Sequence, residues 1–336
     1  MRPRSSSPIH RLLYSTQFRL IVSIAGLCFL VGLLSLIIGG RLIDRGIYNE
    51  AINRIGQDLN SAWEIYSNGY EQIYLGLQLT TLDGKFIDSV IKREADSLLD
   101  ELQDLASVIP LEFAGIYLAE GTLLRLTSKD ASFVDAQIPN PLVGLSMESG
   151  APVWGTTELS GSALRSEDGS LAERASISLV LTPRASQTES KIETSAMVVG
   201  ACVPILDGNK IVGVMYAGTL LNRDIFVVDR IKETVFKQET YKGIDIGTAT
   251  IFFKDIRIST NVPDSKGQSA IGTRVSAEVN TQVLGRGERW TGRAFVVNNW
   301  YMTAYDPIID IFGDRIGMLK FVFNFSRCWP TSSNHR

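Results

Sequence analysis

The sequence predicts an α+β protein with one N-terminal transmembrane helix, a long helix after it and two tandem modules built on antiparallel sheets. Three observations lead to this prediction. One apolar run near the N-terminus is long enough to cross a membrane. Apolar residues at helical spacing then extend to residue 109. Beyond Pro110 the pattern becomes that of strands, and one strand–turn–strand pattern recurs about a hundred residues later.

The apolar run extends from Leu20 to Ile38, nineteen uncharged residues between Arg19 and Arg41. At a helical rise of about 1.5 Å per residue, it matches the roughly 30 Å hydrocarbon core of a bilayer. We therefore assign residues 20–40 to a transmembrane helix. The alternative is a cleavable signal peptide, which fits less well because signal peptides have a shorter apolar region and a small-x-small cleavage site.

Basic residues predict the orientation of this helix. They are more numerous before the span than just after it: Arg2, Arg4, Arg11 and Arg19 against Arg41 and Arg45. The side richer in Lys and Arg tends to stay in the cytoplasm. Residues 1–19 are thus expected in the cytoplasm, and the bulk of this single-pass chain outside it.

The composition is that of a globular chain without catalytic machinery. With 336 residues, 45% of them hydrophobic, and a net charge of −3, it has material for two modules and no basic stripe for nucleic acid. Its two histidines, His10 and His335, lie near the ends, so the folded part offers no imidazole for a triad or a zinc site. Three scattered cysteines make no disulfide framework. We expect no enzyme activity and no cofactor.

Residues 41–110 are expected to form the long helix and a second helix. Apolar and aromatic residues recur at helical spacing along the first: Ile43, Ile47, Ala51, Ile55, Leu59, Ala62, Tyr66, Tyr70 and Ile73. The second helix should run from Ile87 to Ile109, where Pro110 ends it. The stripe on the long helix can pack against its own domain or against a second protomer, and both can hold at different heights.

The first module is expected at residues 111–223. Strands 115–118 and 122–126 should form a hairpin across Glu120-Gly121, and strands 197–204 and 211–220 a second hairpin. Between them, 155–195 is rich in Ser, Thr, Gly and Glu and reads as loop, with one strand at 177–181. Residues 224–240 should then connect to the second module as a helix capped by Asn222 or Asp224.

The second module is expected at residues 241–325 and begins with a hairpin of strands 248–253 and 256–259. A helix bearing Val275, Val279 and Val283 should follow, and then strands 290–297, 300–305 and 316–323. The two modules share a weak repeat. Pro204-Ile205-Leu206-Asp207 and Gly213 correspond to Pro307-Ile308-Ile309-Asp310 and Gly317, at offsets of 103 and 104 residues. We interpret this as a duplication.

Five segments of the second module resemble a known sensor family: Gly247–Phe252, Arg257–Asn261, Ile271–Val275, Trp290–Ala294 and Trp300–Ile308. With the span and the long helix, they make residues 42–323 similar to the double-Cache sensory regions of bacterial two-component sensor kinases and chemoreceptors. The resemblance implies two PAS-like (Cache) modules outside a bacterial inner membrane, the first distal and the second proximal. It also implies a small ligand held between a sheet and its covering loops, and a signal carried by the long helix.

The expected ligand residues lie mainly in the second module. They are Arg293 for a carboxylate, Asp306 for an amine, and Trp300, Tyr301 and Tyr305 as pocket walls. Weaker candidates in the first module are Trp154, Thr156, Glu158 and Tyr216. The alternative is that the aromatic residues are sheet core and that Arg293 neutralises Asp306.

The expected function is that of the membrane-anchored extracytoplasmic region of a two-component histidine kinase, where it senses a small molecule. A chemoreceptor, a cyclase-type receptor and a tethered binding protein without signalling are the alternatives, and an anchored hydrolase is disfavoured by the missing histidines. Besides the ligand, a homodimer through the long helix and membrane lipid are expected partners. Residues 326–336 form a polar tail where relatives enter a second span, which suggests a receptor lacking its output domains.

Overall fold

The computed structural model describes residues 16–128, 131–236, 240–241, 244–245, 247–264, 266–296 and 299–323. The expectations for most of the cytoplasmic segment 1–19 and for the tail 326–336 therefore lie outside the described residues. The chain divides into two units, Met1–Asn53 and Arg54–Arg336, and each is described by itself.

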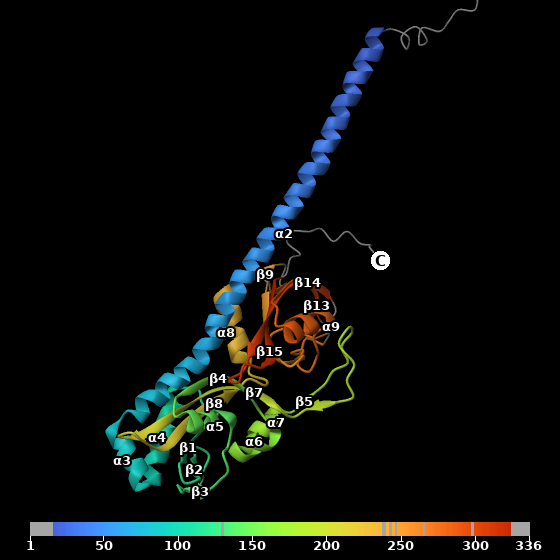
Figure 1. Cartoon of the computed structure of the whole chain (residues 1–336). Coiled ribbons are helices and arrows are strands. Elements are labelled where there is room, and N and C mark those ends of the chain that lie inside the picture. The colour runs from blue at the N-terminus through green and yellow to red at the C-terminus, as the bar shows by residue number, and fades with distance from the viewer. Residues whose placement is uncertain are drawn as a thin grey trace, which may run out of the picture. The chain divides into compact units, whose positions relative to one another are not determined.

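Helix α2 spans Thr16–Thr81 without interruption (Figure 1). Its residues Val22–Leu42 are the one segment of the described chain long and apolar enough to cross a membrane by length and composition. The side chains described in that segment are almost all exposed. Such a surface is costly in water and suited to lipid, which agrees with the span expected from the sequence.

Within the second unit, α2 buries one stripe against its own domain. The stripe consists of Ile55, Leu59, Ala62, Tyr66, Ile73 and Leu77, each at most 3% exposed. The spacing of three, four and seven residues places these side chains on one face of the helix. Of the two arrangements left open by the sequence, packing against its own domain is thus present over this part of α2.

The single helix expected at 87–109 is wrong, because the structure has two. Helix α3 spans Gly84–Lys92 and α4 spans Ala95–Val108. Asp83 starts α3 by accepting a hydrogen bond from the Lys85 amide, and Arg93 ends it with a left-handed φ of 59°. The turn lets both helices bury apolar side chains in one core, which a straight helix would separate.

The first sheet has six strands in the order β3-β2-β1-β8-β7-β4, all paired antiparallel. Their bounds are β1 Phe113–Leu118, β2 Thr122–Arg125, β3 Val134–Asp135, β4 Val153–Leu159, β7 Ala196–Asp207 and β8 Lys210–Leu220. One face carries α2, α3 and α4, and the other carries α5 (Pro141–Ser149), α6 (Gly161–Glu167) and α7 (Gly169–Ala175). The expected hairpins β1–β2 and β7–β8 are both confirmed.

The loop-rich reading of 155–195 is wrong for its first half. That stretch completes β4 and forms α6 and α7, and only β5 (Ile177–Ser178) and β6 (Ile192–Glu193) pair beyond them. Ser160 and Asp168 cap the two short helices by accepting amide hydrogen bonds. The residues that suggested loops are therefore helix caps and an edge strand.

The second sheet has five antiparallel strands in the order β12-β11-β15-β14-β13. Their bounds are β11 Gly247–Phe253, β12 Ile256–Thr260, β13 Trp290–Val296, β14 Asn299–Ile309 and β15 Arg315–Phe323. Helix α9 (Ala277–Asn280) continues into a π-helical turn, Thr281–Gly285, and packs Val275, Val279 and Val283 onto one face of this sheet (Figure 1). Two further short strands, β9 (Thr240–Tyr241) and β10 (Ile244–Asp245), pair with each other.

Apart from β3, the two sheets have the same strand order, and their central hairpins share a register. Gly213 pairs with Ile205 and Gly317 pairs with Ile308, and in each hairpin the register shifts directly after that isoleucine. A Cβ on either glycine would collide with a backbone carbonyl oxygen of the neighbouring strand, that of Tyr117 or of Phe252. The repeat read from the sequence therefore marks equivalent places in two sheets.

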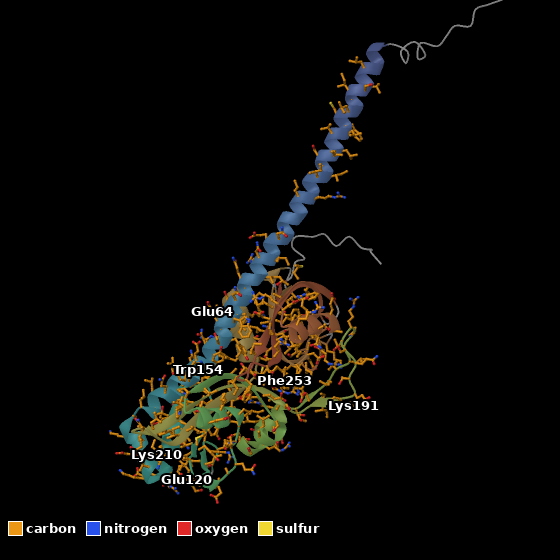
Figure 2. The ribbon with its side chains drawn as sticks, in the orientation of Figure 1. Glu64, Glu120, Trp154, Lys191, Lys210 and Phe253 are labelled. Carbon is orange, nitrogen blue, oxygen red and sulfur yellow. The ribbon has the colours of Figure 1, made fainter. Side chains whose placement is uncertain are left out.

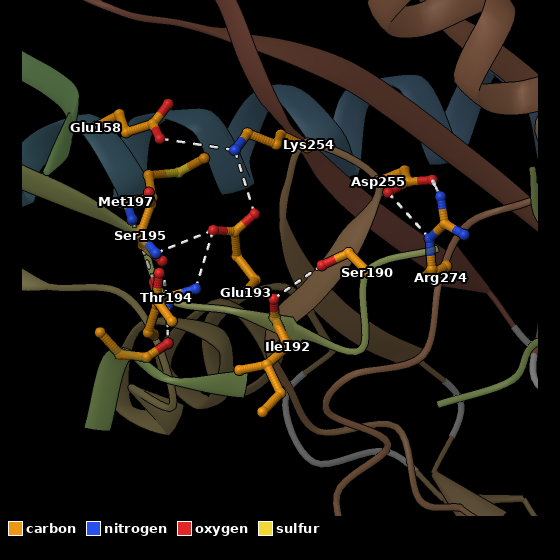
Figure 3. Close-up of polar contacts among 12 residues, drawn as sticks. Glu158, Ser190, Ile192, Glu193, Thr194, Ser195, Met197, Lys254, Asp255 and Arg274 are labelled. Atoms are coloured by element: carbon orange, nitrogen blue, oxygen red, sulfur yellow. Dashed lines mark hydrogen bonds and ion pairs between the residues drawn. The ribbon is translucent and has the colours of Figure 1, made fainter. Parts of the chain in front are cut away.

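Polar contacts join the two sheets (Figure 3). The Lys254 ammonium, in the β11–β12 turn, lies 3.2 Å from a Glu193 oxygen of β6, which pairs with β5 in a separate sheet. It also lies 3.6 Å from a Glu158 oxygen of β4 in the first sheet. The turn after β14 also docks there, since the Ile311 amide donates to the Thr156 carbonyl at 3.0 Å. Arg274 pairs with Asp255 at 2.6 Å and donates to the Ser186 carbonyl, which anchors the loop between β5 and β6.

Helix α8 (Ile225–Phe236) packs against β11 and β12, and Asp224 starts it. The Asp224 carboxylate accepts the Phe226 amide at 2.8 Å, whereas the Asn222 side chain bonds the Met197 amide and the Ala175 carbonyl. Of the two caps considered, Asp224 is correct.

Replacing Asp224 with alanine is expected to lower the free energy of unfolding by about 1 kcal/mol, because the cap is lost. Asp224→Asn should equal or exceed the wild type, since the amide keeps the acceptor and removes a carboxylate whose pKa burial raises. Chemical denaturation of the two variants at neutral pH checks this. Equal losses in both would show that the charge, not the cap, is what matters.

Candidate functional site

The strand register divides the expected second-module residues between the two faces of the sheet. Tyr305 pairs with Trp290 and Tyr301 with Ala294, whereas Arg293 pairs with Met302. Because side chains alternate along a strand, positions 301 and 305 belong to one face, and positions 300 and 306 belong to the other, with 293. Arg293 and Trp300 are placed by backbone pairing alone, as their side chains lie outside the description.

Asp306 faces α2. Its Oδ2 accepts the Trp63 indole N–H at 2.9 Å and lies 2.6 Å from Nη2 of Arg289. This ion pair raises the pKa of the Arg289 guanidinium. The described ion pair of Asp306 is thus with Arg289, whereas the pairing with Arg293 in the core alternative involves a side chain outside the description.

Tyr305 and Tyr301 lie on the face that α9 covers. Tyr305 is 1% exposed and packs in one cluster with Phe252, Met318 and the valines Val275, Val279 and Val283 of α9 and its flanking turns, and burial raises the pKa of its phenol. Tyr301 is half-buried and packs on Val262 and Ala270. Both tyrosines therefore contribute to the core of this face, and Tyr305 also borders the cations described next.

Two cationic side chains are fully buried on the same face, and sequence reasoning missed both as site residues. Lys320 is 0% exposed and Arg257 is 3% exposed. Lys320 pairs with Tyr305 across the strands, its ammonium 5.4 Å from the ring centroid, and the Arg257 guanidinium carbon lies 5.3 Å from the Phe252 ring. A charged residue inside each apolar run, Ile256-Arg257-Ile258 and Leu319-Lys320-Phe321, was the available signal.

These cations have no anionic partner among the described residues. Nζ of Lys320 and the Nε and Nη1 atoms of Arg257 donate no hydrogen bond to a described residue, and neither side chain is in a described ion pair. Burial lowers the pKa of both groups, to about 10 for Arg257, and the repulsion of Arg257 lowers that of Lys320 further. An unpaired buried cation costs several kcal/mol, so this face favours an anion.

Hydroxyl and indole groups share the face and the cross-strand row of these cations. Thr250 and Thr260 share a buried hydrogen bond of 2.7 Å in the row of Lys320, and Trp290 has a buried indole N–H without a described acceptor. Together with the cations they form a donor-rich environment under α9. We call Arg257, Lys320, Tyr305, Thr250 and Trp290 the cationic face.

The equivalent row of the first sheet supplies its own anion. Tyr216 stands three residues after Gly213, as Lys320 stands three after Gly317, and it pairs with Cys202 as Lys320 pairs with Tyr305. The Tyr216 hydroxyl donates to the Glu167 carboxylate at 2.9 Å, and Arg125 Nε lies 3.4 Å from the same group. Burial raises the pKa of Glu167, an effect that Arg125 partly offsets.

The remaining first-module candidates lie apart from Tyr216. Trp154 stacks on Tyr74 of α2 with ring centroids 4.3 Å apart, and the Thr156 hydroxyl bonds the Tyr66 hydroxyl at 2.8 Å. Glu158 meets Lys254 in the contact between the sheets. No group of three or more His, Cys, Asp or Glu suited to a metal ion occurs in the described part of the chain.

Comparisons with known proteins bear on the second sheet. The sequence model of the family "Single cache domain 3" matches residues 219–326, which include α8 and the five-stranded sheet. A search of curated proteins found no match.

Solved structures similar to this chain are sensory domains. The periplasmic domain of Vibrio cholerae LuxQ is 10% identical, with 80% of this chain and 100% of that chain covered at a TM-score of 0.46. The sensor domain of the V. cholerae histidine kinase DctB is 10% identical, with 82% of this chain and 98% of that chain covered at a TM-score of 0.46. The ligand-binding domain of the Pseudomonas fluorescens chemoreceptor CtaA, in complex with L-isoleucine, is 10% identical, with 84% of this chain and 96% of that chain covered at a TM-score of 0.42. The family match thus supports a Cache-type sensor region over residues 219–326.

Proposed function

We propose that this protein is a membrane-anchored extracytoplasmic sensor that binds a small carboxylate on the cationic face of its second sheet. The carrying observation is the burial of Arg257 and Lys320 without an anionic partner among the described residues. A carboxylate placed between them would accept charge-assisted hydrogen bonds from the guanidinium and the ammonium. Binding would thereby remove a desolvation cost that the empty protein carries.

The position of this face supports a role in signalling. Its sheet contacts α2 through the hydrogen bond of Trp63 with Asp306, and the apolar segment Val22–Leu42 belongs to the same helix. A ligand transmits a signal only if it favours one of two arrangements, and a shift of this sheet against α2 is the arrangement we propose. The output is that of a histidine kinase, with a chemoreceptor or a cyclase-type receptor as alternatives.

The first sheet completes this proposal as a second, membrane-distal Cache-like module. Its support is the shared strand order and the shared register of the central hairpins. The proposed location is a bacterial inner membrane with the bulk of the chain periplasmic, and the proposed assembly is a homodimer along α2. Arg293 and Trp300 stay predictions from the sequence, and their positions on the opposite face of the second sheet lie outside the carboxylate site proposed here.

A panel of mono- and dicarboxylates and amino acids tests the ligand class on the full chain in detergent micelles. At least one carboxylate should raise the melting temperature of the protein and show binding by calorimetry. Arg257→Gln should weaken the affinity for that carboxylate about 10- to 100-fold. Lys254→Gln is the matched control, because Lys254 is an exposed cation of the neighbouring turn. Absence of any carboxylate response at millimolar concentration, or equal affinity in Arg257→Gln, would refute the proposed site.

A further inference from the structure

A separate crevice of about 360 Å³ lies among α2, the edge strand β4 and the turn after β14. Its described lining includes four aromatic residues, Trp63, Tyr66 and Tyr70 from α2 and Trp154 from β4, and one acidic residue, Asp310. The volume falls in the range of about 300 to 1,000 Å³ typical of small-molecule pockets. The crevice shares no residue with the cationic face.

The polar ends of two of these rings are already occupied. The Trp63 indole N–H donates to Asp306 at 2.9 Å, and the Tyr66 hydroxyl, buried, bonds the Thr156 hydroxyl at 2.8 Å. The rings are also held against each other, with Trp63 edge-on to Tyr66 at 5.3 Å and Tyr66 edge-on to Tyr70 at 6.2 Å. The crevice therefore offers fixed aromatic surface and few free hydrogen-bond donors.

Trp154 leaves part of its ring open. It is 43% exposed, and Tyr74, which does not line the crevice, stacks on one face of its indole. Figure 2 shows Trp154 beside the α2 ribbon. Gly155 lines the crevice next to it with a φ of 143°, so no side chain fills the space at that position.

The charge of the crevice has one sign. Among the described residues no Lys or Arg lines it, and Asp310 is the acidic residue of that lining, held in the turn by hydrogen bonds from the Phe312 and Asp314 amides at 2.9 and 2.8 Å. An anion would meet rings and a carboxylate there. A cation would meet the negative faces of aromatic rings together with a fixed negative charge.

We propose that this crevice binds a small quaternary ammonium compound. A quaternary ammonium group needs no hydrogen-bond acceptors to replace its hydration, so aromatic rings and one carboxylate suffice to hold it. A primary ammonium would lose more, because the rings do not replace its hydrogen bonds to water. The site is thus distinct in position and in ligand charge from the carboxylate site proposed above.

Occupancy of the crevice acts on the junction of three elements. Thr156 of β4 accepts the Ile311 amide at 3.0 Å and bonds Tyr66 of α2, so a ligand between them braces the first sheet, the second sheet and α2 together. It stabilises whichever arrangement of α2 keeps Trp63, Tyr66 and Trp154 close. Quaternary ammonium binding therefore modulates the sensor from a second site.

Choline is the probe, and its neutral carbon analogue 3,3-dimethylbutan-1-ol has the same shape without the charge. Calorimetric titration of the full chain in detergent micelles should show that choline binds about 5-fold more tightly than the analogue, or better. Trp154→Leu and Asp310→Asn should each weaken choline about 5- to 30-fold. Phe312→Leu, an exposed change in the same turn outside the crevice, should leave the affinity unchanged.

The result that overturns the proposal is equal binding of choline and the analogue, no binding of either, or full affinity in Trp154→Leu. Circular dichroism establishes that the variants are folded, and the exposure of Trp154 makes its replacement tolerable. Arg257→Gln should bind choline normally, so the failure of one proposed site can be told from the failure of the other.

Discussion

Lys320→Met is expected to raise the free energy of unfolding of the ligand-free protein by about 1 to 4 kcal/mol, and to abolish its response to carboxylates. Lys320 is fully buried, its ammonium has no described hydrogen-bond partner, and Arg257 repels it. Methionine has a similar length and carries no charge to desolvate. A residue that destabilises the empty protein and is needed for binding is what a ligand site predicts.

The pH dependence gives a second readout for Lys320. Burial lowers its pKa in the folded protein, whereas the unfolded chain keeps a value of about 10.4. Between these two values the unfolded state binds more protons, so stability should rise with pH across that window. The rise should be smaller in Lys320→Met, as measured by urea denaturation from pH 7 to pH 10.

Lys254→Met is the control for the loss of a lysine. Lys254 is about half exposed and its ion pairs are screened by water, so the change should stay below about 1 kcal/mol. A loss of stability in Lys320→Met comparable to that of a core deletion would contradict the prediction. It would mean that Lys320 already has an anionic partner in the protein.

Glu167→Ala is expected to lower the free energy of unfolding by about 3 kcal/mol. Glu167 is 4% exposed, and its carboxylate accepts the Tyr216 hydroxyl and pairs with Arg125. Alanine leaves both groups without this partner and opens a cavity in the core of the first sheet. Glu167→Gln keeps the volume and an acceptor, so its loss should be below about 1 kcal/mol. Equal losses in the two variants, measured by urea denaturation, would show that the charge of Glu167 dominates.

Glu167 also predicts a pH effect of known sign. Its pKa is raised in the folded state, so the folded protein binds more protons than the unfolded chain from about pH 4.3 up to the raised value. Stability from this group is therefore present below that window and falls as the pH rises through it. Glu167→Gln should remove this fall, and a wild-type profile identical to that of Glu167→Gln would contradict the assignment.

The two sheets differ in whether a described carboxylate faces the equivalent row of strand positions. The first sheet places Glu167 against Tyr216 and Arg125, whereas the equivalent row of the second sheet has Lys320, Tyr305 and Arg257 without a described acid. This contrast supports the second sheet as the place where an external carboxylate binds. Tyr216, although buried in the equivalent row of the first sheet, already donates its hydroxyl hydrogen bond to Glu167 of the same protein.

Local chemistry explains which elements could be read from the sequence. The hairpins β1–β2, β7–β8 and β11–β12 join strands through short turns, and the alternation and turn residues that define them lie close together in the chain. The apolar segment Val22–Leu42 was readable from one uncharged run, and α8 from its cap. The break at Arg93 was not readable, because a helical stripe continues across it and only packing in a shared core favours the turn.

For the candidate site too, residue types could be read from the sequence, whereas the positions of the side chains depended on long-range pairing. Positions 301, 305 and 306 were expected from residue type, but the face that each occupies depends on the register of β14 between β13 and β15. Asp306 meets Trp63 and Arg289, the former 243 positions away in the chain, so no spacing rule could pair them. Long-range pairing of strands, unlike a turn or a cap, is set by which apolar faces can be buried together.

The amino-acid order alone was enough for the apolar segment Val22–Leu42, the helical stripe, the antiparallel hairpins and the repeat at Gly213 and Gly317, because each depends on neighbouring residues and on simple periodicity. Three-dimensional packing was needed to bring Arg257 and Lys320 to one buried face, to place Glu167 against Tyr216, and to gather Trp63 and Trp154 around one crevice. A charge in a strand looks the same in a sequence whether it reaches water or not. Only the packed structure shows which charges lack solvent and a partner, and those are the ones that favour a ligand.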